Sequence, residues 1–470
     1  MPGLKGYFFA VCVLAIFLLL GKILRVKIKL LQTLFLPSSI IAGFVALGLG
    51  PFGLDVFPHW MVDNWRELPG QLINIVFAAL FLGVALPGPK KIWNVGGPQL
   101  CFGVVMGMGQ YFFALLVTVL FLTPVFGVPS IFACILEIGF SGGHGTAAGM
   151  KGVFDSLGFK GGSDLAQMSA TVGIITAVVM GIVLINIAIR RGYCACLNEE
   201  KGIPTYKRIG LIPEKKRFSI ATATVASEAI EPLTFHFAII ALAVLIGWGL
   251  LTLIRPLHPQ LNGFPLFPLA MIGGLIVQSF ALNVKLTFCN ELGEKGRVPL
   301  SHFFDRDTFD RIMGFALDIL VISAIASIKL DLFLANLVPF VVLMLTGIVW
   351  LMLAVIFIAP RMFPSFWFEK GVTEFGMQSG VTAIGLLLLR LVDPLYKTDT
   401  ATAFGLKQMV YEPFLGGGLI TAMAPFFIIG YGPWTSIIAA GVIMLVFIVL
   451  AWLNGWVNMR PQKKFSGDMN

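Results

Sequence analysis

The stretch Ser130–Gly158, which reads SIFACILEIGFSGGHGTAAGMKGVFDSLG, decides the fold. It consists of an apolar leg (Ile131–Phe140), a small polar tip (Ser141–Gly145) and a returning leg (Thr146–Leu157). Ten helical residues rise about 15 Å, which is half of the roughly 30 Å hydrocarbon layer of a membrane. The stretch therefore predicts a re-entrant hairpin whose tip stops near the middle of a membrane.

The composition of the whole chain excludes an ordinary soluble enzyme. Of its 470 residues, 57% are hydrophobic and only 12% are charged, against roughly 25% charged residues in soluble domains. The net charge is +9, but the basic residues come in short clusters between apolar runs. That arrangement sets the orientation of a membrane protein and argues against a nucleic-acid partner. The composition predicts a polytopic membrane protein.

Eleven apolar segments are long enough to span a membrane. They lie at residues 6–24, 35–53, 70–88, 99–122, 164–189, 234–254, 265–284, 312–330, 336–359, 404–429 and 433–457. We divide the chain into a first five-helix repeat (1–194), a cytoplasmic linker (195–232), a second five-helix repeat (233–430), and an extra helix with a cytoplasmic tail (431–470). The stretch 55–69 is amphipathic and is expected to lie along the outer membrane surface.

The two halves resemble each other at two places that have similar offsets. Pro37 precedes Gly43 by six residues, and Pro268 precedes Gly274 by the same distance. The string EIGFSGGHGTA, which begins at Glu137, resembles EFGMQSGVTA, which begins at residue 374. Because each half has an odd number of spans, the second half enters from the opposite face. The predicted fold is an all-α polytopic membrane protein with two inverted repeats of five transmembrane helices, re-entrant hairpins at about 130–158 and 364–392, and one extra C-terminal transmembrane helix.

Lysine and arginine set the expected orientation. The cluster at Lys22, Arg25, Lys27 and Lys29 follows the first span, and the loop 190–217 is also basic. Because basic residues mark the cytoplasmic side, we expect the N-terminus outside and the C-terminus in the cytoplasm. The predicted location is the inner (plasma) membrane.

The two glycine-rich tips, Ser141–Gly145 and about Gly376–Gly380, are the candidate binding site. Main-chain N–H groups at such a tip can bind an anion, and freed carbonyl groups can bind a hard cation such as sodium. Glycines allow a ligand to approach the backbone, although Gly-Gly pairs also occur where helices simply pack. The predicted substrate-binding residues are Ser141, Gly142, Gly143, His144, Gly145, Thr146, Gln378, Ser379, Gly380 and Thr382.

Three carboxylates fall within predicted membrane segments, where an unpaired charge is costly. Glu137 and Glu374 stand before the two tips, and Asp318 lies in the eighth span. All three are candidates for ion binding or coupling. For Glu137 and Glu374, an ion pair that fixes the hairpin is an equal alternative. For Asp318, the alternative is a hydrogen bond that locks two helices together.

The tip motifs carry a family resemblance. Ser141–Thr146 (SGGHGT) and Gly380–Gly385 (GVTAIG) resemble the two hairpins of the glutamate:sodium symporter family, typified by the bacterial GltS transporter. The five-plus-five plan and the basic central loop also match, so the likeness covers about residues 1–430. The resemblance implies sodium-coupled uptake of glutamate or a related amino acid by an elevator-like, alternating-access movement. It also implies a homodimer in membrane lipid and a binding role for both tips.

The predicted function is therefore symport of an anionic amino acid with sodium as the coupling ion and no other cofactor. The alternative is a proton- or sodium-coupled carrier of another organic anion, such as a di- or hydroxycarboxylate. We predict no enzyme, because the sequence lacks a Ser-His-Asp arrangement, an HExxH signature and a recognisable pair of catalytic aspartates. A passive channel is a third possibility that two closed tips disfavour.

Overall fold

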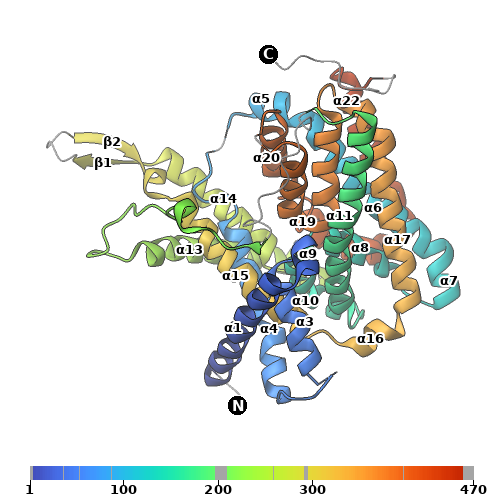
Figure 1. Ribbon diagram of the computed structural model, residues 1–470, viewed down its shortest axis with the longest axis horizontal. Coiled ribbons are helices and arrows are strands. Elements are labelled where there is room, and N and C mark those ends of the chain that lie inside the picture. The colour runs from blue at the N-terminus through green and yellow to red at the C-terminus, as the bar shows by residue number, and fades with distance from the viewer. Residues whose placement is uncertain are drawn as a thin grey trace.

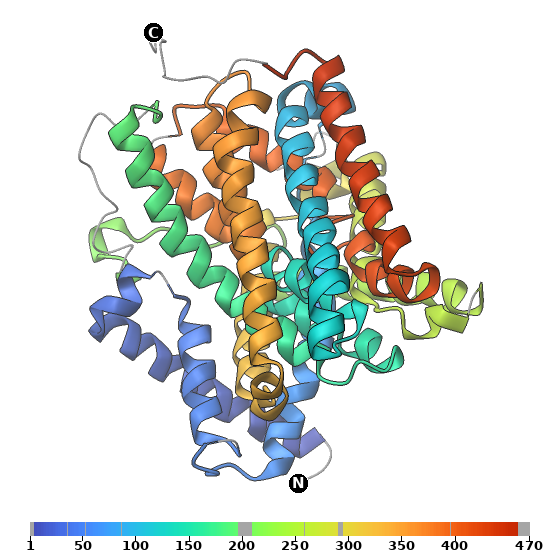
Figure 2. The ribbon, with the colours of Figure 1, turned by 90° about the vertical axis from the view of Figure 1, so that its right-hand side faces the viewer.

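The computed structural model describes residues 4–34, 36–51, 53–85, 87–195, 209–257, 259–289, 295–394 and 396–458. The molecule is built mainly of helices, and the start of α1 (Leu4–Lys27) and the end of α22 (Pro433–Leu453) lie at opposite ends of it (Figures 1 and 2). Within the described residues, seven helical stretches are long and apolar enough to cross a membrane: Leu4–Lys27, Pro89–Phe126, Gly162–Arg191, Pro232–Leu257, Leu337–Met362, Trp367–Val392 and Pro433–Leu453. The expectation of a helical polytopic membrane protein is confirmed.

One group of helices, which we call the first bundle, combines elements from both halves of the chain. It contains α1 (Leu4–Lys27), α3 (Ser38–Leu49), α4 (His59–Ala79), α13 (Pro232–Ile254), α14 (Phe267–Asn283) and α15 (Arg306–Ala326). Small residues let these helices approach closely, as membrane helices require. A Cβ atom on Gly273 of α14, for example, would lie only 2.1 Å from the carbonyl oxygen of Ala243 on α13.

The other group, the second bundle, holds the predicted tips. Its members are α6 (Gly97–Val117), α8 (Cys134–Phe140), α9 (Gly143–Gly149), α11 (Gly162–Arg191), α17 (Leu337–Leu353), α19 (Trp367–Val392), α20 (Thr400–Tyr411), α21 (Leu419–Tyr431) and α22 (Pro433–Leu453). Helix α11 packs against α8, α9 and α19, and α22 packs along α6 (Figure 2). The long α11 thus holds both tips in place.

Short elements complete these two groups. They are α2 (Lys29–Thr33), α5 (Pro89–Lys91), α7 (Thr123–Phe126), α10 (Lys151–Ser156), α16 (Leu330–Ala335), α18 (Ala359–Met362), and π-helical turns at Ile92–Gly96, Thr118–Leu122 and Ala354–Ile358. The 3₁₀ turns lie at Ser130–Ala133, Glu214–Lys216, Arg255–Leu257, Pro259–Gly263 and Leu300–Phe303.

The all-α expectation missed one small sheet. Strands β1 (Lys285–Cys289) and β2 (Lys295–Pro299) pair antiparallel, with Lys285 opposite Pro299. This hairpin projects from the first bundle next to α14 (Figure 1). Because it is short and polar, no hydropathy pattern marks it.

Two other expectations about the segments are revised. Residues 59–69 are not a separate connection but the first turns of α4, which begins at His59, and Trp65 among them is fully buried and donates its indole N–H to the carbonyl oxygen of Ala10 at 2.9 Å. The predicted span 404–429 is not one helix either. It divides into α20 and α21, which are separated by Glu412–Gly418, a segment that we call the glycine loop. Gly416 (φ 69°) and Gly417 (φ 109°) adopt backbone conformations that favour glycine.

Candidate functional site

The first predicted tip is a break between two short helices. Helix α8 ends at Phe140, and α9 begins at Gly143, whose φ of 71° is available to glycine at no steric cost. The break is held against α11, since a Cβ atom on Gly139 would lie 2.4 Å from Ser169 Oγ. On the other leg, Ser163 donates a hydrogen bond to the carbonyl oxygen of Ala147 at 2.8 Å. The helical structure within residues 130–158 is therefore interrupted at the predicted tip.

The second tip lies slightly later than expected. The sequence predicts it at about Gly376–Gly380, but the helical dihedrals of α19 break at Gly380 and Val381, and Val381 has a φ of 66°. The chain turns back there, because a Cβ atom on Gly385 would lie 2.6 Å from the carbonyl oxygen of Thr373. An unbroken helix would separate those residues by about 18 Å along its axis. The two legs of α19 therefore lie side by side, and we use "second tip" for Gly380–Val381.

The two tips meet. A Cβ atom on Gly143 would lie 2.5 Å from Val381 Cγ1, so only glycine allows this approach. Helix α11 closes against the same point, since a Cβ atom on Gly173 would lie 2.2 Å from the carbonyl oxygen of Ser379. Segments that are more than 200 residues apart in the sequence are thus in direct contact.

A cavity of about 780 Å³, which we call the central cavity, opens beside this contact. Helices α3, α4 and α15 form one wall, and the two tips and α20 form the other. Most of its lining is apolar. The predicted site residues that line it are Ser141, Gly142, Gly143, His144, Gly145, Thr382 and Asp318. The structure therefore brings seven of the predicted residues to one cavity.

The remaining predicted residues do not line the central cavity. Thr146, Gln378, Ser379 and Gly380, together with the carboxylates Glu137 and Glu374, are all buried behind the cavity wall. Their hydroxyl and amide groups mostly bond to neighbouring protein atoms, as when Ser379 donates to the carbonyl oxygen of Phe375. Helical spacing explains this outcome, because neighbouring residues on a helix point in different directions.

Sequence reasoning missed several polar residues of the central cavity, among them Gln408 and Glu412. Thr382 Oγ1 donates to Glu412 Oε1 at 2.8 Å, and Gln408 Nε2 donates to the same oxygen at 2.8 Å. Both residues belong to the end of α20 and the glycine loop. The run Gly416-Gly417-Gly418 inside an apparent span was the signal that could have located this second break.

Arg306 also lines the central cavity, but its guanidinium is engaged by the protein. Nη1 donates to the carbonyl oxygens of Leu80 and Leu82 at 2.8 Å, and Nη2 forms an ion pair with Asp310 at 2.7 Å. Arg306 thereby ties the start of α15 to the end of α4. It was not predicted, because it precedes the expected span 312–330.

A family model described as sodium/glutamate symporter matches residues 6–367 of this chain. The chain belongs to the sodium/glutamate symporter family. The match covers most of the chain and includes the first tip, but it ends at the start of α19. The position of the second tip is therefore known from the structure and not from the family match. No curated protein matches the chain.

Because the chain belongs to this symporter family and has seven helices that could cross a membrane among its described residues, it is a multi-pass membrane transporter. In the described part of the chain, no group of three or more His, Cys, Asp and Glu side chains could hold a metal ion.

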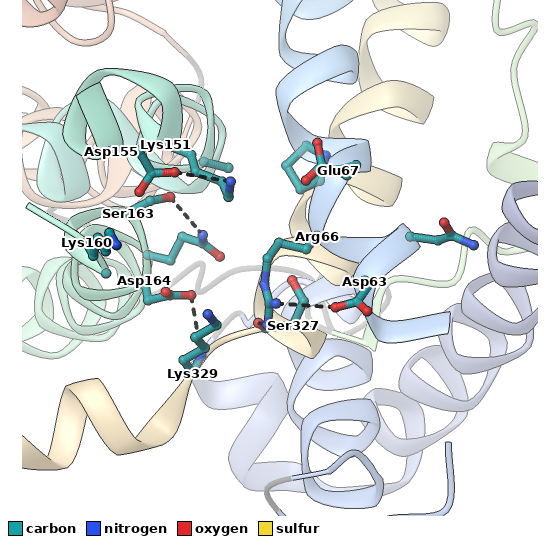
Figure 3. Close-up of a pocket in the computed structure, with 15 residues that line it drawn as sticks. Asp63, Arg66, Glu67, Lys151, Asp155, Lys160, Ser163, Asp164, Ser327 and Lys329 are labelled. Carbon is teal, nitrogen blue, oxygen red and sulfur yellow. Dashed lines mark hydrogen bonds and ion pairs between the residues drawn. The ribbon is translucent and has the colours of Figure 1, made fainter. Parts of the chain in front are cut away.

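This symporter has a second cavity, the charged cavity, of about 650 Å³. Figure 3 shows Arg66 on α4 facing Lys151 and Asp164 on the other side. Arg66 donates to the carbonyl oxygen of Ser327 at 2.8 Å, and the main-chain N–H of Lys329 donates to Asp164 at 3.3 Å. Helix α9 contributes to both cavities, with Ala148 in the charged one and Gly145 in the central one. The first tip and its returning leg therefore separate the two cavities.

Proposed function

We propose that this member of the family is a sodium-coupled symporter that imports glutamate or a related anionic amino acid. One observation carries the proposal: two chain breaks from the two halves meet at the wall of the central cavity, with Gly143 against Val381. Broken helices at such a position are typical of secondary transporters, which bind substrate where two repeats meet.

The second tip supports binding of the substrate carboxylate. Thr382, Ala383 and Ile384 begin the leg that follows the break, and all three line the central cavity. The first N–H groups after a helix break have no helical partner, so they carry partial positive charge toward an anion. Ser141 and His144 of the first tip face the same space.

Two acids favour an amino acid over a dicarboxylate. Asp318 on α15 and Glu412 in the glycine loop both line the central cavity, whereas Arg306, the basic group there, is held by carbonyl oxygens and Asp310. A substrate with an ammonium group would meet complementary charge in this cavity. A substrate with two carboxylates and no ammonium group would meet like charge.

Alternating access fits the two cavities. We propose that residues 130–158 and 364–392 are re-entrant hairpins within inverted repeats, and that the N-terminus is outside the inner membrane. In that orientation, the lining residues Val84, Arg306 and Ala401 of the central cavity would lie toward the cytoplasm, and the charged cavity would face outward. Transport would then move the second bundle against the first in an elevator-like step, within a homodimer held in lipid.

Uptake into proteoliposomes tests the proposal. We expect labelled glutamate to accumulate under an imposed sodium gradient and not under a pH gradient alone. An excess of the corresponding 2-oxo acid should compete poorly because it lacks the ammonium group. Accumulation driven only by pH, or equal competition by the 2-oxo acid, would contradict sodium coupling or amino-acid selectivity respectively.

A pair of variants links that activity to the cavity. Thr382→Val removes the hydroxyl that donates to Glu412, and we expect it to lower sodium-driven uptake about tenfold, as the loss of one hydrogen bond to a charged group would. Thr346→Val is the matched control, because Thr346 is also half-buried but bonds only to its own helix at Val342. Equal uptake by both variants would remove the second tip from the site.

A further inference from the structure

The two corresponding acids, Glu137 and Glu374, are both fully buried but have different partners. Glu374 Oε1 accepts from Lys407 Nζ at 2.7 Å, and neither side chain is exposed. Lys407 also lies 3.6 Å from the centre of the Tyr411 ring. Glu374 thus has an ion-pair partner supplied by the protein itself.

Glu137 has only neutral partners. Its Oε2 accepts from the Tyr111 hydroxyl at 2.6 Å, and its Oε1 accepts from the main-chain N–H of Gly416 at 3.0 Å and from Thr421 Oγ1 at 3.1 Å. No basic side chain of the described residues forms an ion pair with it. A fully buried carboxylate without a cation is costly, so Glu137 needs either a proton or a positive partner from outside the chain.

Two hydroxyl groups near Glu137 have no hydrogen-bond partner. Ser141 Oγ and Thr146 Oγ1 are buried and make no hydrogen bond within the part of the chain that the structure describes. Both approach the glycine loop: a Cβ atom on Gly416 would lie 3.2 Å from Ser141 Oγ, and one on Gly417 would lie 2.4 Å from Thr146 Oγ1. Buried polar groups are nearly always satisfied, so two unsatisfied oxygens beside a carboxylate indicate a missing ligand.

The chemistry of this cluster is that of a hard-cation site. Carboxylate and hydroxyl oxygens come together here, and hard cations prefer oxygen ligands. We propose that Glu137, Ser141, Thr146 and Thr421 bind the coupling sodium ion, an inference that rests on the proposed function. The Glu374 carboxylate takes no second cation, because Lys407 already occupies that position.

This placement explains how sodium could act on the substrate site. The ion would join the first tip, through Ser141 and Thr146, to Thr421 beside the glycine loop. The same loop begins with Glu412, which lines the central cavity along with Ser141. Sodium would therefore fix two parts of the cavity wall before substrate binds, and substrate binding would strengthen sodium binding in return.

Sodium titration of the purified full-length protein, without substrate, tests the site. The measurement is the midpoint of thermal unfolding as sodium chloride replaces choline chloride at constant ionic strength. Sodium should raise this midpoint in the wild type. We expect Thr421→Val and Ser141→Ala to weaken the apparent sodium affinity about tenfold or more, the scale seen when groups that support a metal site are removed. Thr373→Val is the matched control, because Thr373 is equally buried and donates to its own helix at Glu369.

Each outcome has a defined meaning. If Thr421→Val and Ser141→Ala respond to sodium as the wild type does, the site is wrong although sodium coupling can stand. If the wild type itself shows no sodium response and accumulates substrate only under a pH gradient, both the site and the proposed sodium coupling fail. Glu137→Gln should lose the sodium response altogether. If this variant does not fold, Thr421→Val and Ser141→Ala still test whether the site binds sodium.

Discussion

At the scale of single residues, the contact between Gly143 and Val381 defines the candidate site. Gly143 adopts a positive φ without steric cost, whereas Val381 adopts one in spite of its branched side chain. A non-glycine residue in such a region costs on the order of 1–3 kcal/mol, and strain of this kind clusters at functional sites. The strained Val381 lies where the two halves of the chain meet, which supports a functional role for the contact.

Two alanine variants separate backbone strain from contact at Gly143. Gly127 has nearly the same φ (69°), but a Cβ atom there would meet nothing within 4 Å. Gly127→Ala should lose about 1–2 kcal/mol of stability from backbone strain alone and retain uptake. Gly143→Ala should lose a further 1–3 kcal/mol, roughly the cost of overpacking against Val381, and should abolish uptake. Unfolding midpoints and sodium-driven uptake check both; similar behaviour of the two variants would show that the contact is unimportant.

At the scale of elements, the break in α19, and not the length of this helix, determines whether it can cross a membrane. Twenty-six residues of unbroken helix would extend about 39 Å and could cross a membrane. The break at Gly380–Val381 instead folds the two legs against each other, so the first and last turns of α19 lie close together at the end opposite the second tip. Helix α11, with 30 residues and no such break, is the contrasting case.

Single cysteines at the ends of these helices test that difference. In a background without the six native cysteines, Arg361→Cys and Lys397→Cys flank α19, and Lys160→Cys and Arg190→Cys flank α11; all four positions are exposed. A membrane-impermeant maleimide should label both α19 positions from the same side and the two α11 positions from opposite sides. Labelling of the α19 pair from opposite sides would show that α19 crosses the membrane and is not re-entrant.

At the scale of the whole molecule, the two bundles each draw helices from both halves of the chain. Besides α9 against α4 and α15, they meet near the charged cavity, where the main-chain N–H of Lys329 donates to Asp164. An elevator-like step must change contacts of this kind, while contacts inside one bundle persist.

Cross-linking distinguishes these two kinds of contact. Asp164→Cys with Lys329→Cys joins α11 of the second bundle to the segment that follows α15 of the first, and a short, reducible thiol cross-linker should abolish uptake until it is cleaved. Trp93→Cys with Asn454→Cys joins two parts of the second bundle, whose side chains bond at 3.1 Å in the native protein. That control should transport normally after cross-linking. Full activity of the cross-linked Asp164–Lys329 pair would exclude relative motion of the bundles at this point.

The positions of most membrane segments could be predicted from hydropathy, because the preference for lipid is a local property of the chain. The expected span 234–254 corresponds to α13 (Pro232–Ile254), and the extra helix at 433–457 corresponds to α22. The first tip could also be located, since Gly143 is part of a glycine-rich run. In contrast, Glu412 and Gln408 were missed because hydropathy averages hid the glycine loop within one apolar segment.

The sequence by itself therefore determined that this chain is a polytopic membrane protein, which family it resembles, and where its first break falls. Only the tertiary structure decided which of the predicted residues share the central cavity and which acid already has a cation. The partner of Glu374 is Lys407, 33 residues away, whereas Glu137 meets a glycine loop about 280 residues away. Such pairings depend on how helices pack in three dimensions, because a side chain's electrostatic environment is set by spatial neighbours and not by neighbours along the chain.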